Sequence, residues 1–346
     1  MKEERPPRMQ DVAEAAGVHR TTVSLALRDS PRLPQATREE IKRIAERLGY
    51  RPHPMVSALM TARVSRRTPV HQATLAFVSV DKKVPPGWPD THTTYGMMFR
   101  GARDRARQRG YLLEPFWIGD PKLQGNRFAR ILRTRNIHGL MIAPHFGPEN
   151  QIELDWQRVS VIELGYNLRR PAFNRVVRDY YHSMQTVCGE LQAAGHSRIG
   201  LLMPLHSDVK THHQWTSAYL HFQTSLNQRD RLALHRPAHL TTANVRQWIR
   251  TERPDVVVIG GVLYPRPQGE PQFFELPKKQ RYASLHLLER DPSTPGIYED
   301  HPLMGAIAAD QLISQLHRGE FGIPEQATSL LVSGLWHPGK LGASRP

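Results

Sequence analysis

The sequence has a single cysteine and no long hydrophobic run, and both shortages narrow the class of protein. Cys188 has no partner for an internal disulfide, which is typical of a reducing compartment. No stretch of about 18 or more apolar residues occurs, so no membrane span is expected. The charged start at residues 1–8 is not followed by the apolar core of a signal peptide. We therefore expect a cytoplasmic protein, with Cys188 as a small core residue on a helix.

Acidic residues are scarce relative to basic ones. The 346 residues include 47 Lys and Arg against 32 Asp and Glu, a formal net charge of +15. Such an excess favours a polyanionic partner, because each phosphate that a basic side chain neutralises releases counterions. A basic but otherwise ordinary surface would give the same count. Composition alone leaves these two alternatives open.

Motifs of common catalytic sites are missing. The sequence has no phosphate-binding glycine-rich loop, no GxSxG, no HExxH and no cysteines with zinc-ligand spacing. The adjacent His212 and His213 would point apart on a helix, so we interpret them as a solvated pair. The acidic pair Glu299 and Asp300 is interpreted as surface or interface groups. We expect no enzyme, no cofactor and no metal site.

The first 50 residues show three short helical patterns. Apolar residues recur at helical spacing in residues 9–16, in residues 20–28 and from about residue 35 to residue 48. Gly17 and Gly49 follow the first and third patterns, where a helix often ends. Three helices with a tight joint between the first two predict a helix-turn-helix.

From residue 73 onward, short apolar runs alternate with amphipathic stretches. Strands are expected at residues 74–80, 137–144, 159–164, 199–203 and 256–260, and a weaker one at 283–288. Helices are expected at residues 96–110, 126–135, 181–194, 215–228 and 303–317. This alternation predicts parallel sheets wrapped by helices. Prolines bound the segment between the head and this part, which is interpreted as a hinge.

Three runs in the head carry a family resemblance. They are MQDVAEAAGVHRTTVS at residues 9–24, TRExI at 37–41 and LGYxP at 48–52, with a looser match as far as Leu59. They resemble the start of the lactose/galactose repressor family. The resemblance implies an all-α helix-turn-helix head plus an α/β two-lobed sensor domain like a periplasmic binding protein.

The resemblance also implies domain boundaries. The DNA-binding domain would be residues 1–52, the hinge helix and linker 53–72, and the effector-binding and dimerisation domain 73–346. Family landmarks within the last part lie at residues 95–101, 136–143, 191–200, 254–258 and 297–305. They assign residues from about 73 to 177 and 303 to 335 to the first lobe, and about 178 to 300 to the second.

The second helix of the head is the expected recognition helix. Such a helix enters the major groove with its N-terminal residues at base edges, where Arg20 and Thr21 lie. Arginine is the usual bidentate partner of guanine, and threonine can hydrogen-bond a base or contact a thymine methyl. In the family, the positions that match Arg20, Thr21 and Leu25 contact bases. Leu25 stands where arginine is frequent, so the operator is expected to differ at that contact.

Neighbouring polar residues are expected to contact the DNA backbone. These candidates are His19, Thr22, Ser24 and Arg28. Small hydroxyl side chains and the backbone N–H groups of a helix start suit phosphate oxygens. Plain solvation is the alternative for the hydroxyl residues. His19 replaces the family's usual serine at the helix entry, which predicts a weaker cap.

The hinge run at residues 54–60 resembles the family's hinge helix. There, a leucine that matches Leu59 wedges into the minor groove and kinks the duplex, because the contact surface gained on bending offsets the cost of unstacking the bases. Val56 and Met60 are assigned to the same minor-groove contact. Packing in a dimer interface is the alternative for Leu59, and both roles can hold. Pro54 suits the first turn of such a helix.

The effector site is expected at the carboxyl ends of the strands. Ligands of doubly wound sheets bind there, and a sugar cleft combines aromatic faces with a few polar groups. By that rule the candidates are Tyr95, His145, Asn167 and Trp215. A packing or surface role is the alternative for each. The family's ligand-binding Asn or Asp after residues 254–258 is absent, which indicates an unusual sugar or a loss of conventional sensing.

Together these features predict a sugar-sensing transcriptional regulator. We expect a cytoplasmic, nucleoid-associated homodimer, most simply a repressor, that binds a palindromic DNA operator. A small effector, expected to be a carbohydrate, would change its affinity for that operator. The alternative is a periplasmic-type sugar-binding module without a DNA-regulatory role, which the head and the absent signal peptide oppose.

Overall fold

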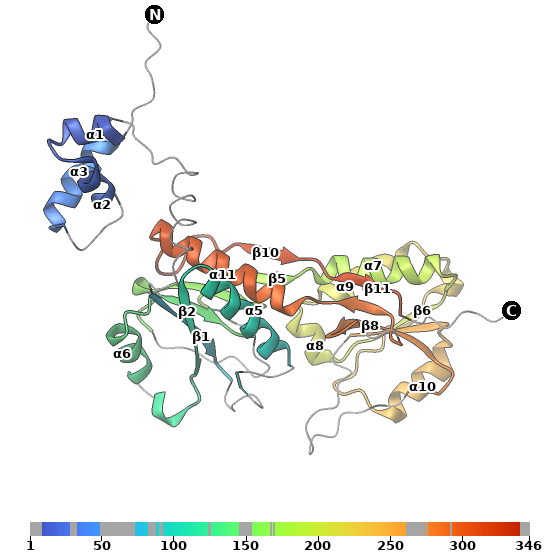
Figure 1. Ribbon diagram of the computed structural model, residues 1–346. Coiled ribbons are helices and arrows are strands. Elements are labelled where there is room, and N and C mark those ends of the chain that lie inside the picture. Colours follow the sequence, from blue (N-terminus) through green and yellow to red (C-terminus); the bar gives the residue numbers. More distant parts are fainter. Residues whose placement is uncertain are drawn as a thin grey trace, which may run out of the picture. The chain divides into compact units, whose positions relative to one another are not determined.

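The computed structural model describes most of the chain as two compact units, residues 1–70 and 71–346 (Figure 1). The described residues are 9–27, 33–48, 73–81, 88–89, 93–123, 126–144, 154–166, 168, 170–260, 274, 276–290 and 293–339. The predicted hinge at residues 53–72 lies outside them. No helix in this part of the chain is long and apolar enough to cross a membrane.

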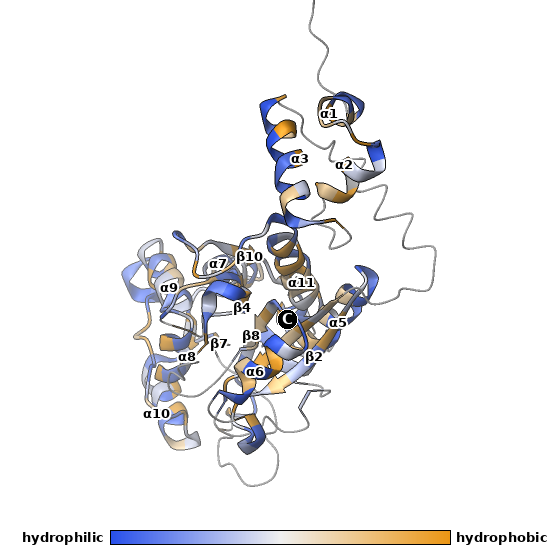
Figure 2. Ribbon diagram, turned by 90° about the vertical axis from the view of Figure 1, so that its left-hand side faces the viewer, coloured by the Kyte–Doolittle hydropathy of each residue, from blue (hydrophilic) through white to orange (hydrophobic). Residues whose placement is uncertain are grey.

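The first unit is a bundle of three helices, as predicted. They are α1 (Met9–Ala15), α2 (Arg20–Ala26) and α3 (Gln35–Arg47). Each helix contributes an apolar face to one small core, which buries Val12, Val23 and Ile41 among others. Hydrophobic and hydrophilic residues alternate along α3, as expected for a helix with one buried face (Figure 2). The amphipathic spacing of the sequence therefore explains the bundle.

The first lobe of the second unit is a parallel sheet of six strands. Its strands are β1 (Ala73–Ser79), β2 (Tyr111–Trp117), β3 (Gly139–Ile142), β4 (Ser160–Leu164), β5 (Asn174–Arg178) and β10 (Ser329–Val332). They lie in the order β10-β5-β4-β3-β1-β2. Alternate residues of β1 enter different cores, because side chains alternate across a strand. Leu75 and Phe77 pack with the helices α5 (Thr94–Gln108) and α11 (His301–Arg318), whereas Val78 packs with α6 (Arg127–Thr134).

The second lobe is a sheet of five strands. Its strands are β6 (Ile199–Leu202), β7 (Val256–Ile259), β8 (Arg281–Leu287), β9 (Gly296–Tyr298) and β11 (Leu335–His337), in the order β11-β9-β8-β7-β6. β11 pairs antiparallel with β9, and the other pairs are parallel. α7 (Tyr180–Ala193) and α9 (Gln214–Thr224) share one core, and α10 (Thr242–Glu252) contributes to another. Cys188 is buried on α7, as predicted.

Four short segments complete the described structure. They are the helix α8 (Leu205–Lys210) and the 3-10 turns at Pro121–Leu123, Trp156–Arg158 and Gln228–Asp230. His212 and His213 lie between α8 and α9 in left-handed backbone conformations, with φ of 51° and 58°. The prediction that they sit on a helix is therefore wrong. His212 stacks on Tyr166 with ring centroids 4.3 Å apart, and His213 pairs with the carboxylate of Asp208.

The described chain passes between the lobes at three places. It leaves the first sheet after Arg178, the last residue of β5, and enters α7. It returns between β9 and α11, where Glu299 and Asp300 lie. It crosses again between β10 and β11. The segments between the lobes are therefore close to the ends of strands, where ligands of such sheets bind.

Two glycines let α5 and α11 approach each other closely in the first lobe. A Cβ atom on Gly101 would lie 1.9 Å from the backbone oxygen of Pro302. A Cβ atom on Gly305 would lie 1.9 Å from the backbone oxygen of Met98. Any side chain at either position would force the helices apart, so this contact requires glycine.

Candidate DNA-binding surface and effector pocket

The start of α2 presents side chains to solvent at the positions expected to read bases. Arg20 and Thr21 are exposed, and Leu25 is partly buried. Val23 and Ala26 face the core of the head instead. The helix is thus anchored by one face while the N-terminal residues of the other stay accessible, which is the geometry that major-groove reading requires.

The residues expected to contact the DNA backbone surround this helix start. His19 is the N-cap of α2, and its Nδ1 accepts a hydrogen bond from the backbone N–H of Thr21 at 3.4 Å. This length is near the upper limit for a hydrogen bond, so the histidine cap is weak, as the missing serine suggested. Thr22 is partly buried and Ser24 lies within α2. Arg28 lies outside the described residues, as do the hinge candidates Leu59, Val56 and Met60.

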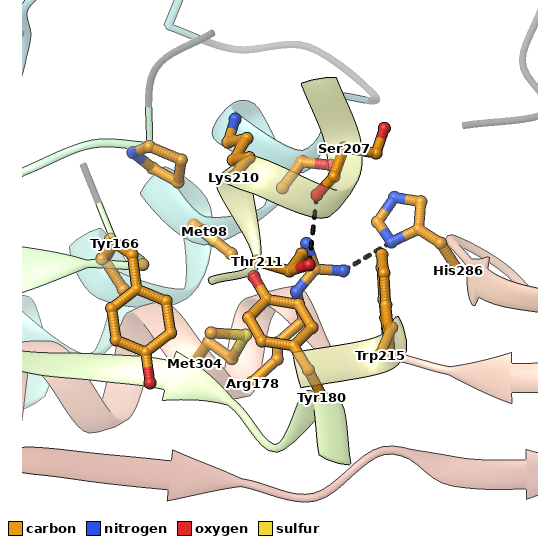
Figure 3. Close-up of a pocket in the computed structure, with 14 residues that line it drawn as sticks. Met98, Tyr166, Arg178, Tyr180, Ser207, Lys210, Thr211, Trp215, His286 and Met304 are labelled. Carbon is orange, nitrogen blue, oxygen red and sulfur yellow. Dashed lines mark hydrogen bonds between the residues drawn. The ribbon is translucent and has the colours of Figure 1, made fainter. Parts of the chain in front are cut away.

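A pocket lies between the two lobes of the second unit (Figure 3). The first lobe contributes Arg178 and residues 164–166 at the end of β4, and the second contributes residues of α8, Trp215 and His286. Its volume is about 80 Å³, whereas small-molecule sites commonly measure about 300–1,000 Å³. The cleft is therefore narrow in this structure, and a ligand of sugar size would need the lobes to shift to make room for it.

Of the four predicted effector residues, Trp215 lines this pocket. Its side chain is 3% exposed and meets the ring of Tyr180 edge-on, with centroids 4.9 Å apart. The indole N–H has no hydrogen-bond partner within the described chain. Tyr95 is buried in the core of the first lobe instead, next to the lining residue Thr94. His145 and Asn167 lie outside the described residues.

The sequence prediction missed the charged residues of the pocket, above all Arg178. This arginine ends β5, and its side chain retains 18% exposure where it faces the pocket. Its Nη1 contacts Nδ1 of His286 at 2.7 Å and also contacts the carboxylate of Glu299. Its guanidinium lies 5.1 Å from the ring centre of Tyr180. Ligands bind at the carboxyl ends of strands, and Arg178 would have been found if this rule had been applied to β5 as well as to the apolar strands.

Glu299 is buried, with 3% of its side chain exposed, so of the two predicted alternatives, a surface or an interface group, the surface position is wrong. Burial alone would raise the pKa of this carboxyl, but Arg178 and His286 lower it to about 2. Burial lowers the pKa of Arg178, and Glu299 more than reverses that effect. Both partners are therefore charged at neutral pH. The other member of the pair, Asp300, caps α11 by accepting a hydrogen bond from the backbone of Leu303.

His301 completes this cluster from the first turn of α11. Burial lowers its pKa to about 3, although Glu299 opposes the shift, so the ring is neutral at pH 7. Ligand atoms of His286, Glu299 and His301 lie within 4.8 Å of one another, a spacing that a metal ion could use. However, the guanidinium of Arg178 contacts two of these three residues and supplies the positive charge. We therefore interpret the cluster as an ionic contact between the lobes and assign no metal to it.

Lys210, the last residue of α8, brings a second cation to the pocket (Figure 3). It belongs to the second lobe, whereas Arg178 belongs to the first. Burial and the charge of Arg178 lower the pKa of Lys210 to about 7, and Asp81 opposes this shift. The lysine therefore titrates near neutral pH in this structure.

Comparison with known proteins identifies the head. Residues 8–53 match the model of the bacterial regulatory proteins of the lacI family. The match spans all three helices, including the exposed start of α2. No curated protein sequence matches the chain.

Solved structures share the fold of the chain at low sequence identity. A protein described as a LacI-family transcriptional regulator from Rhizobium etli is 14% identical, with a TM-score of 0.54, over 76% of this chain and 96% of that one. One from Bacillus cereus subsp. cytotoxis is 15% identical, with a TM-score of 0.50, over 77% and 97%. The lac repressor dimer bound to operator is 18% identical over 96% and 98%, with a TM-score of 0.47. The first two comparisons show the two-lobed α/β fold that the sequence predicted.

Proposed function

We propose that this DNA-binding regulator with a lacI-family head binds a palindromic operator as a homodimer and acts as a repressor. The observation that carries the proposal is the exposed start of α2, with Arg20 and Thr21, within the matched residues 8–53. One head covers a half-site, and a symmetric dimer fits a palindrome. Arg20, Thr21 and Leu25 would contact bases, with His19, Thr22, Ser24 and Arg28 at the phosphates.

The hinge residues contribute a second contact in this proposal. Leu59 would enter the minor groove at the operator centre, with Val56 and Met60 beside it. The support is the sequence resemblance of residues 54–60 to a hinge helix. Contacts of such a helix in the minor groove would offset the cost of unstacking the bases.

A small effector in the pocket would control DNA binding. Both lobes line the pocket, so a bound ligand stabilises one relative position of the lobes over others. The ligand can then change DNA affinity by as much as its affinities for the two states differ. The aromatic faces of Trp215 and Tyr180 suit the ring of a carbohydrate or a carbohydrate derivative. Such a regulator would work in the cytoplasm, at the nucleoid.

DNA retention tests the proposal against the alternative of a sugar-binding module. Fluorescence anisotropy would be measured with the full chain and a pool of random duplexes at several salt concentrations. We expect binding that weakens with salt and that is lost when residues 1–60 are deleted. Retention that is independent of residues 1–60 would exclude the head as the DNA-binding part, and no retention by either protein would favour the sugar-binding module.

A further inference from the structure

We propose that the effector is a small organic anion whose carboxylate or phosphate group is bound between Lys210 and Arg178. The inference rests on the proposed function, because it names the ligand class of the same pocket. It narrows the expected carbohydrate to acidic or phosphorylated derivatives and to ring compounds with a similar charge.

The charge of the pocket lining supports an anion. Among the described lining residues are the two cations Arg178 and Lys210 and the titratable His286, and none of the described lining residues is Asp or Glu. The hydroxyl groups of a neutral sugar are donors that need acceptors, which carboxylates commonly supply. This lining offers hydroxyl and phenol oxygens but no carboxylate. It is therefore better suited to a ligand that brings its own acceptor oxygens.

The carboxylates near the two cations do not line the pocket. Glu299 contacts Arg178 and is almost completely buried. Asp81 is close enough to Lys210 to affect its pKa but does not line the pocket either. Both cations are thus part of the pocket lining, whereas the nearby acids are not.

The two cations come from different lobes, which connects anion binding to lobe closure. Arg178 ends β5 of the first lobe and Lys210 ends α8 of the second. In this narrow cleft the two positive charges repel, and besides burial this repulsion lowers the pKa of Lys210. An anion between them replaces the repulsion with two attractions, so it stabilises a position of the lobes in which both cations reach the anion.

The rest of the pocket lining suits the body of such a ligand. Trp215, Tyr180, Met98 and Met304 provide apolar surface around the cations (Figure 3). The indole N–H of Trp215 is a further donor without a partner in the described chain. Three of the described lining side chains, those of Arg178, Lys210 and Trp215, can only donate hydrogen bonds.

Matched neutral and anionic probes test the proposal. The thermal midpoint of the full chain would be measured with glucose, gluconate and glucose 6-phosphate, with galactose and galactonate, and with benzyl alcohol and benzoate. We expect at least one anion to raise the midpoint and to bind at least tenfold more tightly than its neutral counterpart by calorimetry. Comparison of gluconate with glucose 6-phosphate shows whether the site binds a carboxylate or a phosphate group. A neutral member that binds as well as its anion, or no response to any anion, would overturn the proposal.

Substitution of Lys210 tests whether this residue binds the anion. Lys210→Met should weaken binding of the responding anion at least tenfold, and Lys210→Arg should retain most of it. Lys122→Met removes the same charge from an exposed position outside the pocket and should change nothing. Equal affinities in Lys210→Met and the unchanged protein would contradict the assignment. Loss of DNA retention without any ligand is a separate result, because it contradicts the proposed function and not the ligand class.

Proton uptake provides a second readout. Among the described residues, the charged or titratable groups near Lys210 are Arg178, His286, Tyr166 and Tyr180 of the pocket lining, and Asp81. A bound anion raises the pKa of Lys210 from about 7, so binding at pH 8 should take up as much as one proton. Calorimetry in HEPES and in Tris, which differ in ionisation enthalpy, measures this number. Uptake that is the same in Lys210→Met would contradict the role of the lysine.

Discussion

The guanidinium of Arg178 and the carboxylate of Glu299 form a buried ion pair that connects two crossings between the lobes. Arg178 lies where the chain leaves β5 for the second lobe, and Glu299 where it returns to α11. The same guanidinium faces the pocket. The pair therefore links the position of the segments between the lobes to the site where a ligand would bind.

Removal of one partner of this pair should be costly. Arg178→Met leaves the buried charge of Glu299 with only His286 as a partner, and we expect a loss of about 3–5 kcal/mol in the free energy of unfolding. Arg105→Met is the matched control, because the pair of Arg105 with Asp310 is about one third exposed and contributes about 1 kcal/mol or less. Urea unfolding of the 71–346 unit within the full chain measures both. Similar losses in the two variants would contradict the stabilising role of the buried pair.

His301 should make the protein less stable in mild acid. Its pKa is about 3 in the folded protein, against an ordinary value of 6.5, so between these values the unfolded chain binds more protons. The free energy of unfolding should fall by about 1.4 kcal/mol for each pH unit below about 6.5 from this group alone. His301→Gln should flatten that slope between pH 6.5 and 5, whereas His138→Gln, at an exposed position, should keep it. The same slope in all three proteins would show that His301 does not cause it.

The contact of α5 with α11 gives a prediction about packing. Gly305→Ala places a Cβ atom 1.9 Å from the backbone oxygen of Met98, so we expect a loss of stability of about 1–3 kcal/mol. Gly189→Ala on α7 meets nothing within 4 Å and should be neutral or stabilising, since alanine favours helices. Thermal unfolding compares the two. A Gly305→Ala protein as stable as the original would mean that the helices separate at little cost.

Arg20 gives a prediction about DNA reading. Arg20→Ala should relax the preference at one base pair in each half-site, by about 1–3 kcal/mol. Arg43→Ala removes the same charge from an exposed position of α3, outside the recognition helix, and should leave the base preference unchanged. Binding to a set of single-base operator variants measures both effects. An unchanged preference profile in Arg20→Ala would remove this residue from the base-reading set.

The sequence predicted most of the buried elements because their apolar periodicity is strong. The runs at residues 74–80 and 256–260 are β1 and β7 to within one residue. β5 was missed because its sequence, NRVVR, mixes polar and apolar residues at the point where the chain leaves the first lobe. α10 was missed although Thr241 and Asn244 form a capping box at its start. Such a box marks the N-terminus of a helix.

The candidate site was harder to predict than the fold. Trp215 was predicted from two rules, that ligands bind at the carboxyl ends of the strands and that a sugar cleft presents aromatic faces, and it does line the pocket. Arg178 and Lys210 belong to different lobes, so their proximity depends on how the lobes close and has no local signature. The burial of Glu299 likewise depends on Arg178, which lies 121 residues away in the chain. Short-range patterns cannot contain such pairings.

Selection of bound sites from a random DNA library, with the purified full-length protein, tests the central claim most directly. The account predicts an enriched palindrome of about 14–20 bp with a flexible step at its centre, where two hinge segments would insert Leu59. An enriched sequence without two-fold symmetry would contradict the dimeric head, and no enrichment at moderate salt, with or without the anions above, would contradict sequence-specific binding.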